Sequence, residues 1–457
     1  MLQNVKTKYG ELQGVALTGY TVFKGVPYAK PPVEELRWKR PQEPDHWEGV
    51  RICDHFANIT PQSFPTPDTP WGGLYYKEFY SDPEFLPPIN EDCLYLNIWT
   101  PAEKGDEKLP VAFWIHGGGF GGGFNSEIEF DGEEYCKRGV ILVTVEYRCG
   151  VFGFLAHPWL SAEDEKGISG NYGIYDQIAA LDWVYENIAG FGGDPENITV
   201  FGQSAGCMST QVLVSSPLTG NKISKAILQS GVETTYGFLA TPSLEEEEEF
   251  GRQVVELTGA KSIEELRSMT MEPLMEAKDR FDGEMMRRIM SGEKSGAEGS
   301  LMIVPNVDGY LLEKSVKTVF AEGSMKKIPY IAGCVTDDLG RTDEDREKNE
   351  PGVLMESCKK WCGRQAELSN PPAYCYFFDH SLPGENGPDV AFHSAELWYT
   401  FGTLGRCWRP MEERDYEVSR QMLDAWTNFM KTGDPNGEGV PAWKPCTEED
   451  PYVWEIV

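Results

Sequence analysis

One short stretch limits the possible folds of this chain more than any other: Phe-Gly-Gln-Ser-Ala-Gly, residues 201–206. The β-favouring run Ile198 to Val200 leads into it, and a helix-permissive segment follows Gly206. Glycines on both sides of a serine allow a turn so tight that a Cβ would collide with the neighbouring strand or helix. The pattern predicts a strand, a sharp turn that exposes the Ser204 hydroxyl, and a helix. Because the chain has 48 glycines, an ordinary Gly-Ser turn is the alternative.

Composition excludes several kinds of partner. The formal net charge is −32 over 457 residues, so the field of the protein repels nucleic acid, anionic membranes and polyanionic substrates. No segment has the length and apolarity of a membrane span, and residues 1–8 lack the apolar core of a signal peptide. These features predict a cytoplasmic protein without membrane insertion. They leave the oligomeric state open.

The eleven cysteines are scattered without paired metal spacing. Cys358 and Cys362 are the closest pair, and their helical spacing predicts a shared helix face rather than a metal site. We expect reduced, structural thiols in a reducing compartment. The sequence indicates no metal ion and no cofactor.

Apolar runs recur along most of the chain and predict the strands of one sheet. Several do not alternate, which is typical of strands covered on both faces. Helical periods lie between them, notably Tyr175 to Ile188. The alternation predicts one α/β domain, residues 1–457, with a mostly parallel central sheet covered by helices. Earlier β-favouring pieces predict a small N-terminal antiparallel sheet. The predicted runs are Gly14 to Leu17, Tyr20 to Phe23, Leu94 to Trp99, Val111 to Ile115, Val140 to Val145, Ile198 to Phe201, Ala226 to Leu228, Ile328 to Ala332 and Tyr374 to Phe378.

Polar segments interrupt this pattern. Residues 241–300 begin with a capping box at Ser243 to Glu246, and residues 341–372 form a second polar stretch. Both predict helical insertions over the active site. Val418 to Met430 predicts an amphipathic helix that ends near Gly433. Residues 61–89 are rich in proline and aromatics (Trp71, Tyr75, Tyr76, Tyr80) and predict a long loop that lines a cleft or packs on the surface.

A serine nucleophile needs a base, and six histidines are available. In chains with this turn the acid and then the histidine follow the serine, which leaves His380 and His393. His380 ends the run Tyr374 to Phe378, where a ring closes the edge of a core. His393 lies on a loop beyond that run and is the predicted base.

The acid is expected directly after the run Ile328 to Ala332. Asp337 and Asp338 share that turn, and stabilising the turn is an alternative role for each of them. Position alone leaves both open.

The glycine stretch His116 to Phe120 follows the run Val111 to Ile115. Glycines let an ester approach backbone N–H groups that side chains would otherwise shield, so this stretch predicts an oxyanion hole. A flexible glycine loop is the alternative, because Gly121 to Gly123 continue the run. No Gly-Lys-Ser/Thr closes the stretch, which excludes a phosphate loop. His116 is expected to fix the loop rather than to act as a base.

With these residues in place, the chain resembles the type-B carboxylesterases, the cholinesterase and carboxylesterase group of the α/β-hydrolase fold. The resemblance covers nearly the whole chain. It implies Ser204 as nucleophile, His393 as base, and Gly118, Gly119 and Ala205 as oxyanion donors. The matching stretches are Phe23 to Ala29, Glu91 to Asn97, Trp114 to Phe120, Tyr147 to Leu155, Gly170 to Gln177, Asn187 to Gly206, Gln229 to Gly231 and Phe392 to Leu397.

Four departures from the family pattern matter. The acid of the family is usually a Glu that directly precedes a Gly. The resemblance aligns Asp338 with this Glu, and Asp337 remains the alternative acid. The stretch from acid to base is short, which implies trimmed lid elements. The usual partner of Cys93 is replaced by Thr60, so the family disulfide is expected to be absent, with Cys53 as a remote substitute partner. Gln203 stands where cholinesterases carry Glu, which argues against choline esters.

The sequence therefore predicts a cofactor-free serine carboxylesterase that acts on small uncharged esters through an acyl-enzyme. One alternative is a feruloyl or acetyl esterase on plant polysaccharide, suggested by the aromatics from Trp71 to Tyr80. A second is a non-catalytic binding or adhesion member of the family. Acyl-chain and alcohol preference stay open.

Overall fold

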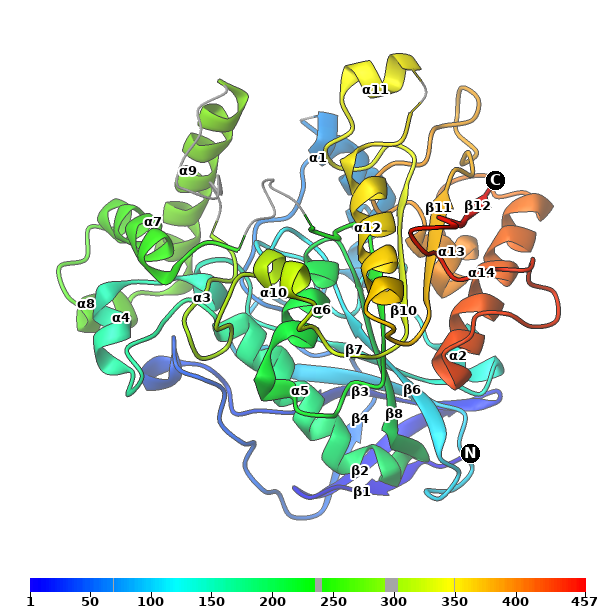
Figure 1. Ribbon diagram of the computed structural model, residues 1–457. Helices are drawn as coiled ribbons and strands as arrows, with labels where there is room; N and C mark the ends of the chain where they lie inside the picture. The colour runs from blue at the N-terminus through cyan, green and yellow to red at the C-terminus, as the bar shows by residue number, and fades with distance from the viewer. Residues whose placement is uncertain (69, 235–240, 292–302, 349) are drawn as a thin grey trace.

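A 12-stranded sheet organises the computed structural model, which describes residues 1–457 apart from 69, 235–240, 292–302 and 349 (Figure 1). The strand order is β1-β2-β3-β5-β7-β6-β8-β9-β10-β11-β12, and β4 pairs with β2. The strands are β1 Asn4–Lys6, β2 Glu11–Leu17, β3 Tyr20–Pro27, β4 Val50–Cys53, β5 Tyr95–Thr100, β6 Leu109–Ile115, β7 Ile141–Val145, β8 Gly193–Gln203, β9 Lys225–Gln229, β10 Tyr330–Val335, β11 Ala373–Phe378 and β12 Val453–Ile456.

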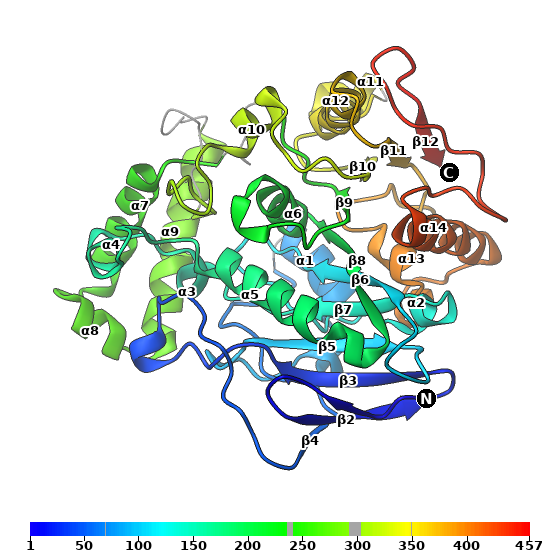
Figure 2. The ribbon, with the colours of Figure 1, turned by 60° about the horizontal axis from the view of Figure 1, so that its bottom comes forward.

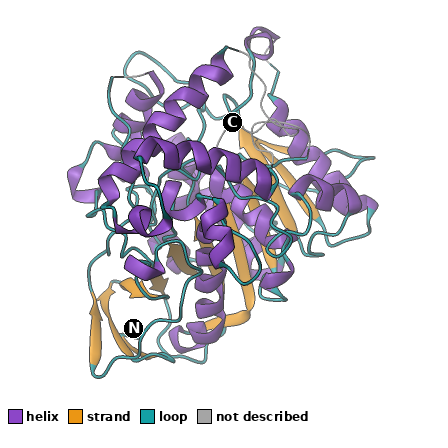
Figure 3. Cartoon of the chain, turned by 90° about the vertical axis from the view of Figure 1, so that its left-hand side faces the viewer, coloured by secondary structure: helices purple, strands orange, loops and turns teal. Residues whose placement is uncertain are grey.

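The sheet is parallel from β7 to β12 and has an antiparallel N-terminal part. β3 pairs antiparallel with β5, and β5 pairs antiparallel with β7. The predicted N-terminal strands are thus one end of the central sheet rather than a separate sheet (Figure 3). This architecture confirms the predicted mostly parallel α/β fold with antiparallel N-terminal strands.

Both faces of the central strands are buried. Along β6, Phe113 and Ile115 belong to one apolar cluster and Ala112 and Trp114 to the other, because successive side chains point to opposite faces. This explains why the central strands read as apolar runs without alternation.

Helices cover the two faces (Figure 2). On one face α5 and α6 pack against β8, and α12 packs against β10 and β11; on the other face α2 and α14 pack against β6, β7 and β8. The helices are α1 Pro70–Tyr75, α2 Glu133–Lys137, α3 Gly150–Phe154, α4 Pro158–Glu163, α5 Tyr172–Asn187, α6 Ala205–Ser215, α7 Leu244–Thr258, α8 Ile263–Ser268, α9 Met271–Met290, α10 Val316–Glu322, α11 Asp343–Lys348, α12 Val353–Glu367, α13 Leu397–Phe401 and α14 Glu413–Thr432.

The first predicted insertion contains helices α7, α8 and α9, which lie together beside the sheet (Figure 1). Ser243 caps α7 with the expected capping box. The last part of the segment, residues 292–300, lies outside the described residues. α9 contributes Lys278, Asp279 and Asp282 to the wall of a cavity described below.

The second predicted insertion is polar only in its first half. All residues of α11 lie outside the core, but α12 buries Leu354, Cys358, Trp361 and Cys362 against the sheet. These residues recur every three or four positions among charged ones, so α12 covers the sheet as an amphipathic helix.

Residues 61–89 differ from the predicted loop. They hold α1, a π-helical turn at Tyr76–Tyr80 and a 3₁₀ turn at Pro83–Phe85. The sequence also gave no indication of β4 and β12, which are only four residues long.

Two further observations concern membrane-spanning segments and the cysteines. Among the described helices, none combines the length and the apolarity required to cross a bilayer. All eleven cysteines are free thiols, Cys93 and Cys53 included. The Thr60 hydroxyl accepts a hydrogen bond of 3.0 Å from the Cys149 backbone N–H.

Candidate active site

Ser204 lies between the end of β8 and the start of α6. Its φ of 57° is in the left-handed region, which is strained for a residue with a side chain. The turn needs both of its glycines: a Cβ at Gly206 would lie 2.0 Å from the Ile115 carbonyl oxygen, and one at Gly202 would lie 2.4 Å from Gly206. The tight turn read from the sequence is therefore present, and Ser204 is only half-buried within it.

The structure brings His393 and Asp338 together from two separate turns. Nδ1 of His393 lies 2.6 Å from Oδ1 of Asp338, and both side chains are buried. The backbone N–H of Val335 donates to Oδ2 of Asp338 at 3.0 Å, and that of Leu339 donates to Oδ1 at 2.8 Å. Burial acts to raise the pKa of Asp338, but the His393 ring and these hydrogen bonds outweigh it, so the pKa is lowered. The carboxylate is ionised at neutral pH.

The neighbouring Asp337 points away from the imidazole. Its side chain is 35% exposed and pairs with Arg346 at 2.9 Å. Its backbone N–H donates to the Ala391 carbonyl at 2.8 Å, which joins the turn of the acid directly to the turn of the histidine. Of the two aspartates that the sequence left open, Asp338 is the one in contact with His393.

The other candidate histidine, His380, is engaged elsewhere. Its Nε2 lies 2.8 Å from Oδ1 of Asp415, which also accepts a hydrogen bond from the Tyr399 hydroxyl. His380 thus closes the edge of the core, as expected for a residue at the end of β11.

The His393 ring lies beside the serine turn. Nε2 of Gln203, the residue before Ser204, is 3.3 Å from Nε2 of His393. Within the described part of the chain, this ring nitrogen has its hydrogen-bond contact with Gln203 and none with the Ser204 hydroxyl. Catalytic hydrogen bonds are often long in free enzymes and tighten only when substrate binds.

The glycine loop packs directly on the serine turn. A Cβ at Gly117 would lie 3.2 Å from the Ser204 Cβ, and one at Gly118 would lie 2.2 Å from the Gly122 carbonyl oxygen. Gly118 and Gly119 have φ values of 107° and 61°, and the Gly118 carbonyl accepts hydrogen bonds from the backbone N–H groups of Gly121 and Gly122. The loop needs glycine at these positions. It lies next to the N-terminus of α6, which begins at Ala205.

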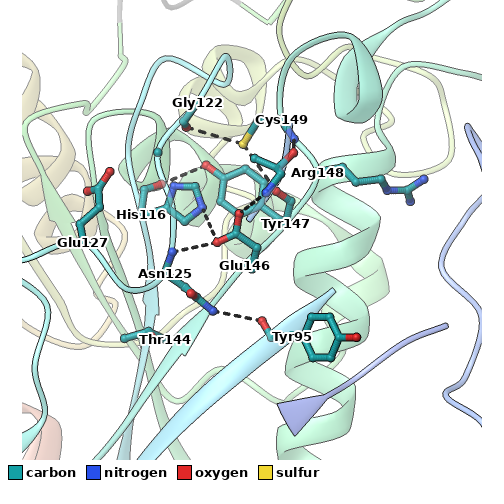
Figure 4. A network of polar contacts seen from close by, with 12 residues as sticks. Tyr95, His116, Gly122, Asn125, Glu127, Thr144, Glu146, Tyr147, Arg148 and Cys149 are labelled. Atoms are coloured by element: carbon teal, nitrogen blue, oxygen red, sulfur yellow. Dashed lines mark hydrogen bonds and ion pairs between the residues drawn. The ribbon is translucent and has the colours of Figure 1, made fainter. Parts of the chain in front are cut away.

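His116 anchors the start of this loop (Figure 4). The ring is fully buried and stacks on Tyr147 with 4.3 Å between centroids, and the Tyr147 hydroxyl donates to the His116 carbonyl at 3.0 Å. Burial lowers the pKa of His116 to about 4. The ring is therefore neutral at pH 7 and unsuited to take the serine proton.

Glu146 completes the anchor and had no signal in the sequence (Figure 4). Its two carboxylate oxygens accept hydrogen bonds from the backbone N–H groups of Thr60 and Asn125, at 2.9 and 2.8 Å. Its Oε2 lies 4.0 Å from Nε2 of His116. Burial raises the pKa of this carboxyl well above its usual value. One side chain thus links the loop before α1 to both ends of the glycine loop.

A cavity of about 310 Å³ opens next to these elements. Its lining includes Gly117 and Gly118 of the glycine loop, Gln203 before Ser204, and Ser394 after His393. The aromatic segment contributes Tyr75, Phe79 and Tyr80 to the lining, whereas Tyr76 is exposed and the Trp71 side chain lies outside the described residues. Polar side chains complete the wall: Gln62, Ser63, Glu127, Glu129, Lys278, Asp279 and Asp282.

The sequence also matches a known protein family along its length. The model of the carboxylesterase family matches residues 2–353 and 353–457. The chain belongs to the carboxylesterase family. It is thus a carboxylic ester hydrolase with the α/β-hydrolase fold, which confirms the family resemblance seen in the sequence.

Two relatives and one solved structure show how far this similarity extends along the chain. The chain is 33% identical to the para-nitrobenzyl esterase of Bacillus subtilis (strain 168), over 98% of this chain and 94% of that protein. It is 38% identical to the fumonisin B1 esterase of Sphingopyxis macrogoltabida, over 74% of this chain and 57% of that protein. The solved structure of a thermophilic para-nitrobenzyl esterase superposes with a TM-score of 0.82 at 30% identity, covering 100% of this chain and 96% of that one.

Proposed function

We propose that this carboxylesterase hydrolyses small uncharged esters through an acyl-enzyme formed on Ser204. The observation that carries the proposal is the 2.6 Å contact between His393 Nδ1 and Asp338 Oδ1, with the other ring nitrogen facing the residue next to Ser204. A base held by an ionised acid beside a serine on a strained turn is the arrangement that serine hydrolases use.

In the first half of the reaction, the Ser204 hydroxyl attacks the ester carbonyl carbon while Nε2 of His393 takes its proton. Asp338 holds the ring in the tautomer with Nδ1–H and stabilises the imidazolium. The backbone N–H groups of Gly118, Gly119 and Ala205 donate hydrogen bonds to the carbonyl oxygen and stabilise the negative charge that develops on it. The imidazolium then gives its proton to the departing alcohol oxygen as the C–O bond breaks.

In the second half, water replaces the alcohol. His393 takes a proton from the water as its oxygen bonds to the acyl carbon, and then returns that proton to Ser204 as the acid leaves. The steps need no oxidant, reductant or metal ion.

One observation supports an ester with a neutral alcohol. Gln203 is uncharged, so no carboxylate at that position lies beside the nucleophile to attract a choline group. The names of the two para-nitrobenzyl esterases above, one a relative and one a solved structure, suggest para-nitrobenzyl esters as a first probe. The lining by Tyr75, Phe79 and Tyr80 favours hydroxycinnamate esters as the second candidate substrate class, and turnover of para-nitrophenyl butyrate against methyl ferulate separates the two.

The decisive experiment replaces Ser204 by alanine. Ser204→Ala should abolish para-nitrophenyl ester turnover and labelling by a fluorophosphonate probe while the protein stays folded. Ser63→Ala removes a serine that lines the neighbouring cavity and should leave both readouts unchanged. Turnover by the Ser204→Ala variant would exclude this mechanism, and an unlabelled, inactive wild-type protein would favour the non-catalytic alternative.

Free thiols support a reducing compartment as the site of action. All eleven cysteines are unpaired, and Cys407 is the only one that is not buried. Proteins of oxidising compartments generally pair their cysteines. We therefore propose a cytoplasmic location.

A further inference from the structure

Outside the catalytic region, three cysteines from distant parts of the chain meet in the core. Cys362 comes from α12, Cys375 from β11, and Cys446 from the segment that leads into β12. Their sulfur atoms all lie within 4.8 Å of one another, and all three residues are buried. The sequence predicted only the shared helix face of Cys358 and Cys362, because the other two sulfurs arrive through tertiary packing.

The backbone holds these three residues in place. The Cys446 N–H donates to the Ala373 carbonyl at 2.8 Å, which fixes the C-terminal segment at the start of β11. The Cys362 thiol donates to the Tyr374 carbonyl at 3.6 Å. Next along the segment, β12 pairs with β11 from Cys375 to Phe378. The three sulfurs therefore converge from three elements whose positions are set independently of them.

The geometry points to a metal site: we propose that Cys362, Cys375 and Cys446 bind one soft d¹⁰ metal ion. Metal–sulfur bonds of about 2.3 Å in a trigonal arrangement place the sulfurs about 4 Å apart, so a contraction of less than about 1 Å completes the site. Thiolate sulfur selects soft ions such as Cu⁺ and Zn²⁺ over harder divalent ions. Structural Zn²⁺ sites have four ligands, and among the described residues the group of ligand atoms has three members. Cu⁺ is therefore the ion that this set suits best.

Burial raises the pKa of Cys362 and Cys375 well above the usual value of a thiol, so both are protonated before an ion binds. When the ion binds, metal–sulfur bonds replace the remaining S–H bonds and the displaced protons pass to solvent. No electron transfer is needed.

The site lies away from the chemistry. Cys375 is in the amino-terminal half of β11, whereas Asp338 and His393 follow the carboxyl ends of β10 and β11. The ion would tie α12, β11 and the C-terminal segment together. Loading should therefore raise the melting temperature and leave kcat unchanged.

The test titrates the reduced full-length protein, without oxygen, with Cu⁺ held by bicinchoninate and, in a separate arm, with Zn²⁺ held by a chromophoric chelator. We expect one equivalent to transfer, with X-ray absorption showing three sulfur neighbours. Each of Cys362→Ser, Cys375→Ser and Cys446→Ser should weaken binding by more than the roughly 10- to 100-fold that loss of an outer-shell partner causes. Cys136→Ser, which removes a buried cysteine of α2, should bind like the wild type. The two arms show which ion the site prefers.

Two results would overturn the proposal. They are no transfer from either chelator, and nitrogen or oxygen neighbours in the X-ray absorption spectrum. The absorption measurement on wild type does not depend on the variants, so it decides the matter even if Cys446→Ser fails to fold.

Discussion

The two halves of the candidate active site are built in different ways. The half on β6 and β8 holds the glycine loop and the Ser204 turn, and each is a continuous stretch whose glycines dictate its shape. The half on β10 and β11 holds Asp338 and His393, which come from turns 55 residues apart and meet through packing. The first half is encoded locally and the second by the tertiary structure. Substitutions should therefore fail differently in the two halves.

The largest effect is expected in the tertiary half, at His393. His393→Ala should lower kcat by about 10⁵-fold or more. Without its base the Ser204 hydroxyl is a poor nucleophile, and removing one member of such a triad costs about as much rate as removing all three. Stopped-assay kinetics with a para-nitrophenyl ester measures it. His380→Gln, which breaks the buried pair with Asp415, should lower the melting temperature and keep kcat near the wild-type value. Equal kcat losses in the two variants would contradict the assignment.

The two neighbouring aspartates give the sharpest comparison within this half. Asp338→Asn should lower kcat by about 10⁴-fold, because an amide favours the wrong tautomer of the imidazole. Asp337→Asn loses an ion pair at the surface, and such pairs are worth about 0–1 kcal/mol. Its kcat should stay within a few-fold of wild type in the same assay. A larger loss in Asp337→Asn would reassign the acid.

In the half on β6 and β8, a substitution at Gly118 tests whether kcat depends on the conformation of the glycine loop. A Cβ there would meet the Gly122 carbonyl oxygen at 2.2 Å, so Gly118→Ala must displace the loop. Loss of an oxyanion donor costs about 10²–10³-fold in kcat, and we expect a fall of that size with a smaller change in KM. Gly19→Ala is the matched control, since Gly19 also has a positive φ but open space around it. Similar kcat in both variants would show that the loop adapts.

The smallest effect concerns stability in acid. Burial lowers the pKa of His116 from 6.5 to about 4. As the pH falls from about 6.5 towards 4, the unfolded chain takes up a proton that the folded state refuses, so stability is lost in that window and is fully present above it. The loss attributable to this group is about 3 kcal/mol at pH 4.5.

His116→Gln removes this titration from the protein. Urea unfolding at pH 4.5 and 7.5 should show a smaller difference in the free energy of unfolding than in wild type. An unchanged difference would mean that His116 takes up its proton in the folded state.

The same division explains what the sequence could predict. The strand before Ser204, its turn and the glycine loop were predictable, because steric demands between near neighbours fix them. The choice between Asp337 and Asp338 was not, since it depends on Asp337 pairing with the segment around Phe392. Glu146 could not be found either, because its partners Thr60 and Asn125 are remote in the chain. The buried face of α12 was underestimated, since its charged residues dominate the composition of the segment.

The backbone hydrogen bond from Asp337 to Ala391 has a consequence for how such enzymes diverge. It fastens the acid turn to the base turn at their roots. Of the chain between these turns, α12 and β11 pack in the core, whereas no residue of α11 is buried. The excursion that carries α11 can therefore be lengthened, shortened or replaced without moving the proton-transfer pair.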